Sequence, residues 1–243
     1  MEKITENETG RWLRFENWDA ESGLFQGVTV KSPGGWGMSE EQVRELADGK
    51  GFSTVRRLRQ VHGSRVVSAE EGHWSGGNPP EADGIIGSLP GVLGLITVAD
   101  CVPVFLFERG SGSWGLLHAG WRGVESGVLT ESLNALRALK GCSAENVEFY
   151  LGPAICGNCY EIGPEVAQRL IRAVSAEGLR PAGEKYYADL RRLLPIQAEA
   201  SGVKAGNIFT SAYCTRCHNE LFHSWRAEGQ PALRRMWAFL GRL

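Results

Sequence analysis

The chain has 243 residues, is 42% hydrophobic and carries a formal net charge of −2. This length and apolar content are sufficient for a large core, and we expect a single domain over residues 1–243. The near-neutral charge gives no indication of nucleic acid or a membrane surface as a partner. Residues 1–21 lack the apolar segment of a signal peptide, and the longest apolar run, 94–107, is too short to cross a bilayer. We therefore expect a cytoplasmic protein.

Hydrophobic periodicity in the first half of the chain is mostly that of β-strands. Strands are expected at 23–31, 55–60, 65–69, 82–87, 92–99, 102–108 and 114–118. Ser39 and Gln42 have the spacing of a capping box, which predicts a helix over about 39–47.

The second half alternates helices with single strands. Helices are expected at 124–139, 163–176 and 187–200, and strands at 147–151, 208–212 and 235–240. Pro195 should kink or split the helix that contains it. Strands that cluster early, with helices between the later ones, predict an α+β fold with mixed or largely antiparallel sheets under helices.

Two of the apolar segments contain reactive side chains. Asp100 and Cys101 lie between two expected strands, and His118 ends a third. Burying a polar group without a partner costs about 1–3 kcal/mol. These side chains therefore either satisfy one another or belong to a site.

His62, at a turn between two earlier strands, forms a candidate metal-binding set with Cys101 and His118. Two imidazoles and a thiolate suit a three-ligand zinc site that keeps one position open. These three residues are too far apart in sequence to form a local motif, so other interpretations stay open. They include a core cysteine, structural histidines, and a metal-free pair with Cys101 as nucleophile and His118 as base. A non-enzymatic binding role also stays open.

Arg122 and Asp100 are candidates for substrate contacts. Arg122 lies between two glycines at the expected start of a helix, where N–H groups and a guanidinium favour an anion. A local cap or ion pair is the alternative for this arginine. Asp100 can orient an imidazole or bind an amine or hydroxyl of a substrate, or it can cap a turn.

The chain has six cysteines, and without a secretion signal these favour thiols or metal ligands over disulfides. Cys156 and Cys159 form one CxxC pair, and Cys214 and Cys217 form another. Two such pairs are typical of a structural zinc ribbon, although the gap between them is long. The alternative is that each pair lies in an ordinary turn.

Several motifs together resemble a known family. They are Arg59-Gln60-Val61-His62-Gly63, Ala82-Asp83-Gly84, Thr97-Val98-Ala99-Asp100-Cys101-Val102-Pro103, His118-Ala119-Gly120-Trp121-Arg122-Gly123, Leu151-Gly152-Pro153-Ala154-Ile155, Cys159-Tyr160-Glu161-Ile162-Gly163 and Asp189-Leu190. On these segments the chain resembles the laccase-domain or multicopper polyphenol oxidase family. Members of that family are also described as peptidoglycan editing factor and as zinc-containing purine nucleoside phosphorylases. The resemblance covers about residues 52–240.

The resemblance implies a fold, a site and an activity. The fold would be α+β with layered mixed sheets, like the deamidase toxins of the cytotoxic-necrotizing-factor type. The metal-binding and catalytic residues would be His62, Cys101 and His118, with Gln60, Asp100 and Arg122 as substrate-binding residues. The activity would be phosphorolysis of adenosine, inosine, guanosine and methylthioadenosine, with adenosine deaminase activity beside it. Zinc would be the cofactor, phosphate the co-substrate and a monomer the functional form.

The chain departs from the family pattern in several places, beginning with residues 31–50, which are shorter and different. Leu194 stands where an Asn often follows the Asp-Leu pair, and Trp225 lies in a segment that departs from the family's Phe-Ser-Tyr-Arg-Arg. The substrate range could differ for these reasons. Family members often carry cysteine at the positions of Cys159 and Cys214, whereas Cys156 and Cys217 are additional, which weighs against a zinc ribbon.

The older family name implies copper chemistry, which the composition restricts. A four-copper laccase needs roughly ten histidines, since imidazole dominates such copper sites. The five histidines of this chain cannot build one. A single copper ion bound by the candidate trio could still support weak phenol oxidation, because copper exceeds zinc in raw affinity.

Overall fold

The computed structural model describes residues 1–18, 23–35, 37–70, 74, 78–140, 142–229 and 235–243. His73, in the expected loop after residue 70, lies outside the described residues. Among the described residues, no helix has the length and apolar character needed to cross a bilayer.

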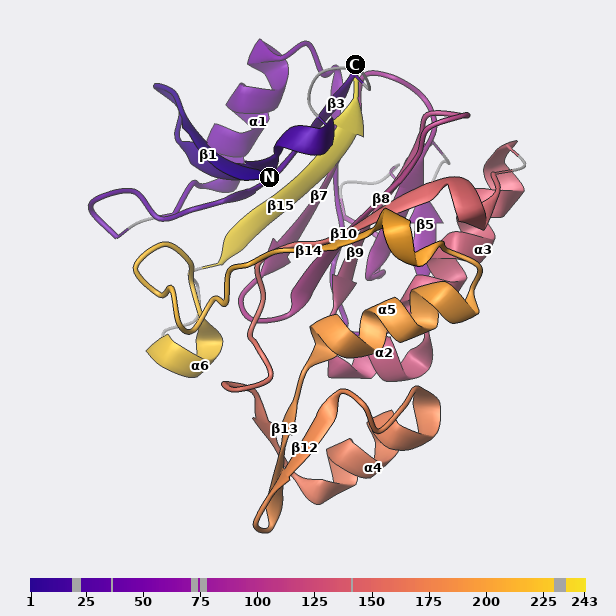
Figure 1. Ribbon diagram of the computed structural model, residues 1–243. Helices are drawn as coiled ribbons and strands as arrows, with labels where there is room; N and C mark the ends of the chain where they lie inside the picture. The colour runs from indigo at the N-terminus through magenta and orange to yellow at the C-terminus, as the bar shows by residue number, and fades with distance from the viewer. Residues whose placement is uncertain (19–22, 36, 71–73, 75–77, 141, 230–234) are drawn as a thin grey trace.

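Two mixed six-stranded sheets form the centre of the protein (Figure 1). The first sheet has the order β1 (Glu2–Glu6), β2 (Arg11–Phe15), β3 (Leu24–Thr29), β15 (Met236–Arg242), β7 (Val92–Val98) and β4 (Thr54–Arg57). The second has the order β14 (Ile208–Thr210), β10 (Val147–Leu151), β8 (Val102–Glu108), β9 (Ser113–Ala119), β6 (Gly84–Gly87) and β5 (Val66–Ser68). Neighbouring strands are antiparallel except β4 with β7, β14 with β10, and β5 with β6.

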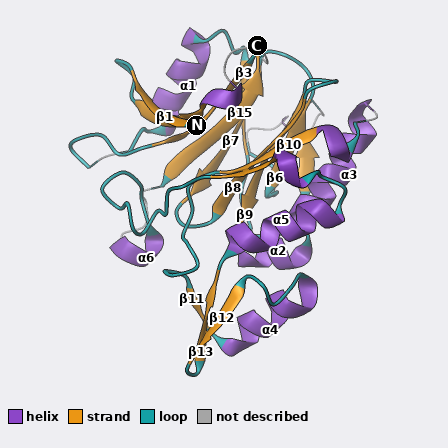
Figure 2. Cartoon of the chain, viewed as in Figure 1, coloured by secondary structure: helices purple, strands orange, loops and turns teal. Residues whose placement is uncertain are grey.

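A small third sheet, six α-helices and three short 3-10 helices complete the described elements. The antiparallel third sheet has the order β11 (Glu161–Ile162), β13 (Lys185–Ala188) and β12 (Leu179–Ala182). The helices are α1 (Glu40–Gly49), α2 (Trp121–Ser126), α3 (Val128–Lys140), α4 (Pro164–Ala173), α5 (Leu190–Ala200) and α6 (Trp225–Glu228). Figure 2 shows α1 on one side of the strands and α2, α3 and α5 on the other.

Side-chain alternation along β8 explains the layered arrangement. Val102, Val104 and Leu106 pack with residues of α3 and α5 in one buried cluster. Phe105 and Phe107 point the opposite way and pack with residues of the first sheet. Because successive strand residues face opposite sides, one strand serves both the helix layer and the interface between the sheets. A third cluster covers the outer face of the first sheet with α1.

The structure confirms an α+β protein with mixed sheets and flanking helices, and it corrects several expected elements. β1 and β2 were not anticipated. The expected helix over 124–139 is two helices, because Gly127 adopts φ 80° and ends α2. The expected helix over 187–200 is wrong at its start, where β13 runs to Ala188 and Asp189 caps α5. Pro195 lies inside α5 without splitting it.

Trp114 fixes the spacing between the two sheets. Its indole is fully buried, and an added Cβ at Gly87 would lie 2.5 Å from its Cζ2 atom. A Cβ at Gly94, on β7 of the facing sheet, would lie 2.9 Å from its Cζ3 atom. The two glycines therefore provide the space that this ring occupies.

We expect Gly87→Ala to lower the free energy of unfolding by about 1–3 kcal/mol, because an extra methyl group overpacks the core. Urea denaturation measures the change. Gly49→Ala is the control, since no atom lies within 4 Å of its added Cβ, and it should be neutral or stabilising by about 0.5–1 kcal/mol. Equal stability of the wild type and Gly87→Ala would contradict the role given to Trp114.

Candidate metal centre and its cavity

The six candidate site residues line one cavity. The cavity has a volume of about 390 Å³ and lies where the loops after β4, β7 and β9 meet. It is lined by Gln60, His62, Thr97, Ala99, Asp100, Cys101, His118, Gly120, Trp121, Arg122, Tyr160, Trp225, Arg226 and Arg235. The fold thus brings together residues that are far apart in sequence.

His62, Cys101 and His118 offer ligand atoms that all lie within 4.8 Å of one another. The two imidazole rings are nearly perpendicular, at 83°, with centroids 4.7 Å apart. His118 is buried, Cys101 is half-buried and His62 is exposed. Zinc binds histidine nitrogen and cysteine sulfur at about 2.0–2.3 Å. The three residues could hold such an ion, and all three line the cavity.

Asp83 holds both histidines in place. Its fully buried carboxylate accepts hydrogen bonds from the N–H groups of Val61, His62 and Gly63 at 3.1, 3.0 and 2.7 Å. Nδ1 of His118 lies 2.8 Å from the same carboxylate. A proton on Nδ1 leaves Nε2 as the ligand atom, which is how carboxylates orient metal-binding histidines.

The charge of Asp83 is stabilised by these contacts. Burial opposes its ionisation, but the hydrogen bonds from His118 and from the loop N–H groups keep the pKa of the carboxyl below its usual range. Asp83 was not among the expected site residues. The available signal was an acidic residue next to an apolar strand, in the segment Ala82-Asp83-Gly84.

Cys101 and His118 form a strongly coupled pair. Burial raises the pKa of a thiol, but the charge and hydrogen bond of His118, together with those of His62, lower the pKa of Cys101 to about 6. Burial opposes protonation of His118, yet the Cys101 charge and Asp83 raise its pKa to about 9. Cys101 is therefore a thiolate near neutral pH, which is the form that binds metal or attacks as a nucleophile.

Two of the site residues have an unusual backbone. His62 and Asp100 adopt φ angles of 60° and 81°, and no other described non-glycine residue has a positive φ. Such conformations cost about 1–3 kcal/mol each and persist only where neighbouring contacts enforce them. At His62 the enforcing contacts are those of Asp83.

The side chain of Asp100 holds the loops around the cavity. One carboxylate oxygen accepts a hydrogen bond from the Thr215 hydroxyl at 2.6 Å, and the other accepts from the Arg226 N–H at 2.8 Å. Gln60 acts in a similar way, because its amide pairs with both the N–H and the C=O of Thr97 at 2.8 Å. Direct contact of either residue with a substrate stays a prediction.

Gly120 keeps the cavity open beside the trio. An added Cβ would lie 3.0 Å from Sγ of Cys101 and 3.3 Å from Cδ2 of His62. Any larger residue would therefore compete for the space in which the ligands lie.

The wall of the cavity combines cationic and aromatic side chains. The guanidinium of Arg122 stacks on Trp121 at 4.4 Å, and that of Arg226 lies over Tyr160 at 5.0 Å. Arg122 lies in α2, a helix of only six residues. The reason to expect it to bind an anion is therefore its position in the cavity beside His62, Cys101 and His118, and not the helix terminus. Tyr160 and Arg226 were not among the expected site residues.

Two departures from the family pattern lie in different environments. Trp225 lines the cavity and is 44% exposed. Leu194 is fully buried in the cluster beneath α5 and does not line the cavity. Of these two positions, only that of Trp225 is in a place to contact a bound molecule in this cavity.

Comparison with known proteins identifies the family. The family described as multi-copper polyphenol oxidoreductase laccase matches residues 39–242. The chain belongs to this family. This family member is 34% identical over 209 residues to the purine nucleoside phosphorylase of Deinococcus radiodurans, covering 84% of this chain and 77% of the relative.

Two further relatives agree with this assignment. Purine nucleoside phosphorylase YlmD of Geobacillus stearothermophilus is 30% identical over 211 residues, which are 82% of the family member and 77% of the relative. The crystal structure of YlmD matches with a TM-score of 0.85 at 26% identity, covering 100% of this chain and 99% of the other. Adenosine deaminase RL5, from an unknown prokaryotic organism, is 32% identical over 151 residues, covering 60% of this chain and 57% of the relative.

α6 carries Trp225 and Arg226 and is held by a partly buried ionic network around Glu228. The Glu228 carboxylate accepts hydrogen bonds from Lys31 Nζ and Asn219 Nδ2, both at 2.8 Å, and from the Ser224 N–H at 3.2 Å. Nδ1 of His223 lies 3.2 Å away. Burial opposes ionisation, but these partners lower the pKa of Glu228 to about 2.

We expect Asp83→Asn to weaken zinc binding by about 10–100-fold, because an amide cannot accept all the hydrogen bonds that orient the two histidines. Competition with a chromogenic chelator measures the affinity. Asp48→Asn, on the exposed last turn of α1, is the matched control and should bind zinc as the wild type does. Unchanged affinity in Asp83→Asn would show that the histidines are held by other contacts.

The Glu228 network predicts a dependence of stability on pH. A carboxyl whose pKa falls from 4.5 to about 2 on folding stabilises the fold above about pH 4.5 and loses that contribution as pH falls toward 2. Denaturation at several pH values should show a shallower loss over this window for Glu228→Gln than for the wild type. Glu199→Gln, exposed on α5, should follow the wild type. Identical pH profiles for all three proteins would contradict the prediction.

Proposed function

We propose that this family member is a zinc-dependent purine nucleoside phosphorylase. One observation carries the proposal: arginine and aromatic side chains line the same cavity as His62, Cys101 and His118. The names of the relatives support a nucleoside as the substrate. Adenosine, inosine, guanosine and methylthioadenosine are the expected substrates.

The donor set favours zinc as the metal. A thiolate and two imidazoles suit zinc, and a site with three protein ligands is typical of catalytic zinc. Copper binds the same donors with higher raw affinity, so copper loading at this one site is the basis proposed for any phenol oxidation. When bound, zinc supplies Lewis acidity at the open position.

The cavity wall supplies binding groups for both substrates. Arg122, Arg226 and Arg235 line the cavity and provide guanidinium groups for a phosphate dianion. Trp225 and Tyr160 provide flat faces on which a purine can stack. The cavity thus offers binding groups for both a phosphate and a purine base.

Phosphorolysis exchanges one bond at the sugar. A phosphate oxygen forms a bond to the anomeric carbon while the bond from that carbon to the purine nitrogen breaks, and the purine leaves with the electron pair and then takes a proton. The arginines hold and orient the phosphate for this attack. Asp83 keeps the proton on Nδ1 of His118 throughout, so the ring presents Nε2 toward the cavity.

Two other reactions fit parts of the same site. Deamination of adenosine uses water in place of phosphate and is supported by the name of one relative. A metal-free hydrolase is supported by the alignment of Asp83, His118 and Cys101, since an acid–imidazole–thiolate chain is a nucleophilic arrangement. The hydrolase has no need of His62, whereas the zinc site requires it.

We propose that the monomer is the functional form. We also propose a cytoplasmic location, where purine nucleosides and phosphate are both present. The likeness to the toxin fold stays a prediction.

The deciding experiment measures metal and product together. Purified protein should contain zinc and should release adenine and ribose 1-phosphate from adenosine only when phosphate is added. His62→Ala should lose the zinc of this site and lower the rate by at least about 100-fold. Arg122→Gln should raise the KM for phosphate by about tenfold, which is the loss of one charge-assisted contact of about 1.4 kcal/mol.

Arg172→Gln is the control for the arginine variant, because Arg172 is exposed on α4 and lies outside the cavity. Production of inosine and ammonia without phosphate would replace phosphorolysis by deamination as the main reaction. Activity on an amide or ester that persists in His62→Ala and without metal would establish the hydrolase instead.

A further inference from the structure

Two short turns that are far apart in sequence meet beyond the ends of two neighbouring strands. β10 and β14 are parallel, and their pairing continues past both strands. Ser211 N–H donates to the Leu151 carbonyl at 2.8 Å, and Ala154 and Cys214 form a further parallel bridge. The two CxxC turns follow this extension, so the fold places four thiols side by side.

The four sulfur atoms form a compact cluster. Those of Cys156, Cys159, Cys214 and Cys217 all lie within 4.8 Å of one another, and the Cys159 and Cys217 sulfurs are 3.4 Å apart. A tetrahedral ion with bonds of about 2.3 Å separates its sulfur ligands by about 3.8 Å. All four cysteines are free thiols. The spacing therefore suits one ion bound by four sulfurs.

Backbone groups shape both turns around this cluster. The N–H groups of Cys156 and Cys217 are directed at Sγ of Cys214, at 3.3 and 3.5 Å. The Cys159 N–H closes its own turn on the Cys156 carbonyl at 2.9 Å, and the His218 N–H closes the second turn on the Cys214 carbonyl at 2.9 Å. N–H groups that donate to sulfur stabilise the thiolate, which is the form that binds metal.

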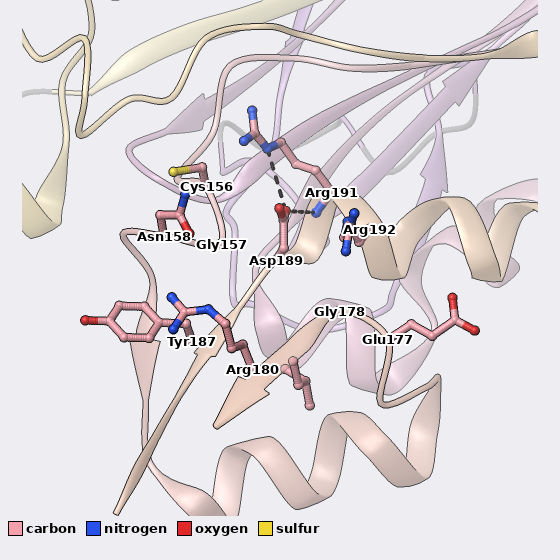
Figure 3. A pocket seen from close by; sticks show the side chains of 11 residues that line it. Cys156, Gly157, Asn158, Glu177, Gly178, Arg180, Tyr187, Asp189, Arg191 and Arg192 are labelled. Atoms are coloured by element: carbon pink, nitrogen blue, oxygen red, sulfur yellow. Dashed lines mark hydrogen bonds and ion pairs between the residues drawn. The ribbon is translucent and has the colours of Figure 1, made fainter. Parts of the chain in front are cut away.

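The surrounding structure holds the cluster in place from α5. Nη1 of Arg191 donates to the carbonyls of Ser211 and Tyr213, at 3.2 and 3.0 Å, just before the second turn. Asp189 accepts the Arg191 N–H at 3.0 Å, and Cys156 borders the cavity of about 500 Å³ that these side chains line (Figure 3). The contacts from α5 thus add to those within the two turns, which favours tight binding by pre-organisation.

We propose that Cys156, Cys159, Cys214 and Cys217 bind one structural zinc ion. Four thiolates in a tetrahedral arrangement are the preferred donor set of structural zinc, and they leave no position for water. The sequence resemblance weighed against this ribbon because two of the cysteines are additional to the family pattern. The geometry supplies the reason for their presence, since each additional cysteine completes one CxxC turn.

The two turns that would hold this zinc ion also contact residues that line the cavity of His62, Cys101 and His118. Tyr160, a wall residue, directly follows the first turn, and Thr215, within the second turn, donates to Asp100 at 2.6 Å. Nη1 of Arg216 also crosses from the second turn to the carbonyl of Cys159 at 3.2 Å. Zinc joins the two turns, and through them it holds the loop that precedes Cys101.

The test separates this ion from the one in the cavity. Cys101→Ala removes a ligand of the cavity set and should retain about one zinc per chain, with four sulfur ligands by X-ray absorption spectroscopy. The double variant Cys156→Ser/Cys217→Ser should contain one zinc fewer than the wild type by elemental analysis and should melt at a lower temperature. Cys142→Ser, a buried cysteine beside Ser111, is the control and should keep the wild-type zinc content.

Two results would overturn the proposal. One is Cys101→Ala protein without zinc, or with zinc that has fewer than four sulfur ligands. The other is a disulfide between Cys159 and Cys217, detected by mass spectrometry of the unreduced protein. If the double variant does not fold, the absorption spectrum of Cys101→Ala still decides, and that spectrum does not depend on which reaction the cavity catalyses.

Discussion

The Asp83 carboxylate is the interaction on which the site depends. It is fully buried and accepts hydrogen bonds from three consecutive N–H groups and from His118. A buried charge is tolerated only when it is fully hydrogen-bonded. The loop that carries His62 and the strand that carries His118 must therefore both be in place before Asp83 is satisfied, so the carboxylate couples formation of the site to formation of the fold.

Asp100, next to Cys101, also joins separate segments through hydrogen bonds to its carboxylate. Asp100 has a strained backbone, and its two oxygens hold the loop of Thr215 and the first turn of α6. His62 and Asp100 thus flank the cavity as two strained residues, each held through a carboxylate. Strain of this kind is tolerated at functional sites because it positions groups that relaxed backbone would direct elsewhere. The remaining packing, centred on Trp114 between the sheets, provides the rigid frame.

Much of the fold could be predicted from local pattern. From β6 to β9 the strand sequences are either alternately polar and apolar or continuously apolar, which is typical of strands. Ser39 and Gln42 correctly predicted where α1 begins. β1 was missed because its sequence is largely polar, and β2, which contains Trp12, Leu13 and Phe15, was missed because it is short and lies within a polar segment. The division of residues 124–139 between α2 and α3 was not predicted, because it depends on the left-handed backbone of one residue, Gly127. Leu190 begins α5 because Asp189 caps it, a local signal that helical periodicity across 187–200 obscured.

The site was predictable only in part. Cys101 and His118 stood out because reactive side chains in apolar strands need partners, and His62 was added as a third donor. Asp83, Tyr160 and Arg226 could not be assigned roles, because their positions depend on pairing between segments that are distant in sequence. The four-cysteine cluster is a similar case. The two CxxC patterns are visible in the sequence, but only the parallel pairing of β10 with β14 brings them together.

The three candidate ligands are held by different parts of the fold. Val102 pairs with Ala119 and Pro103 with His118, so the backbones around Cys101 and His118 are tied by one ladder of hydrogen bonds. His62 is exposed and belongs to a separate turn. Cys101 and His118 are therefore held by one hairpin, whereas the turn of His62 is tied to that hairpin through Asp83. Of the three side chains only that of His62 is exposed, so solvent reaches the set from the side of that turn.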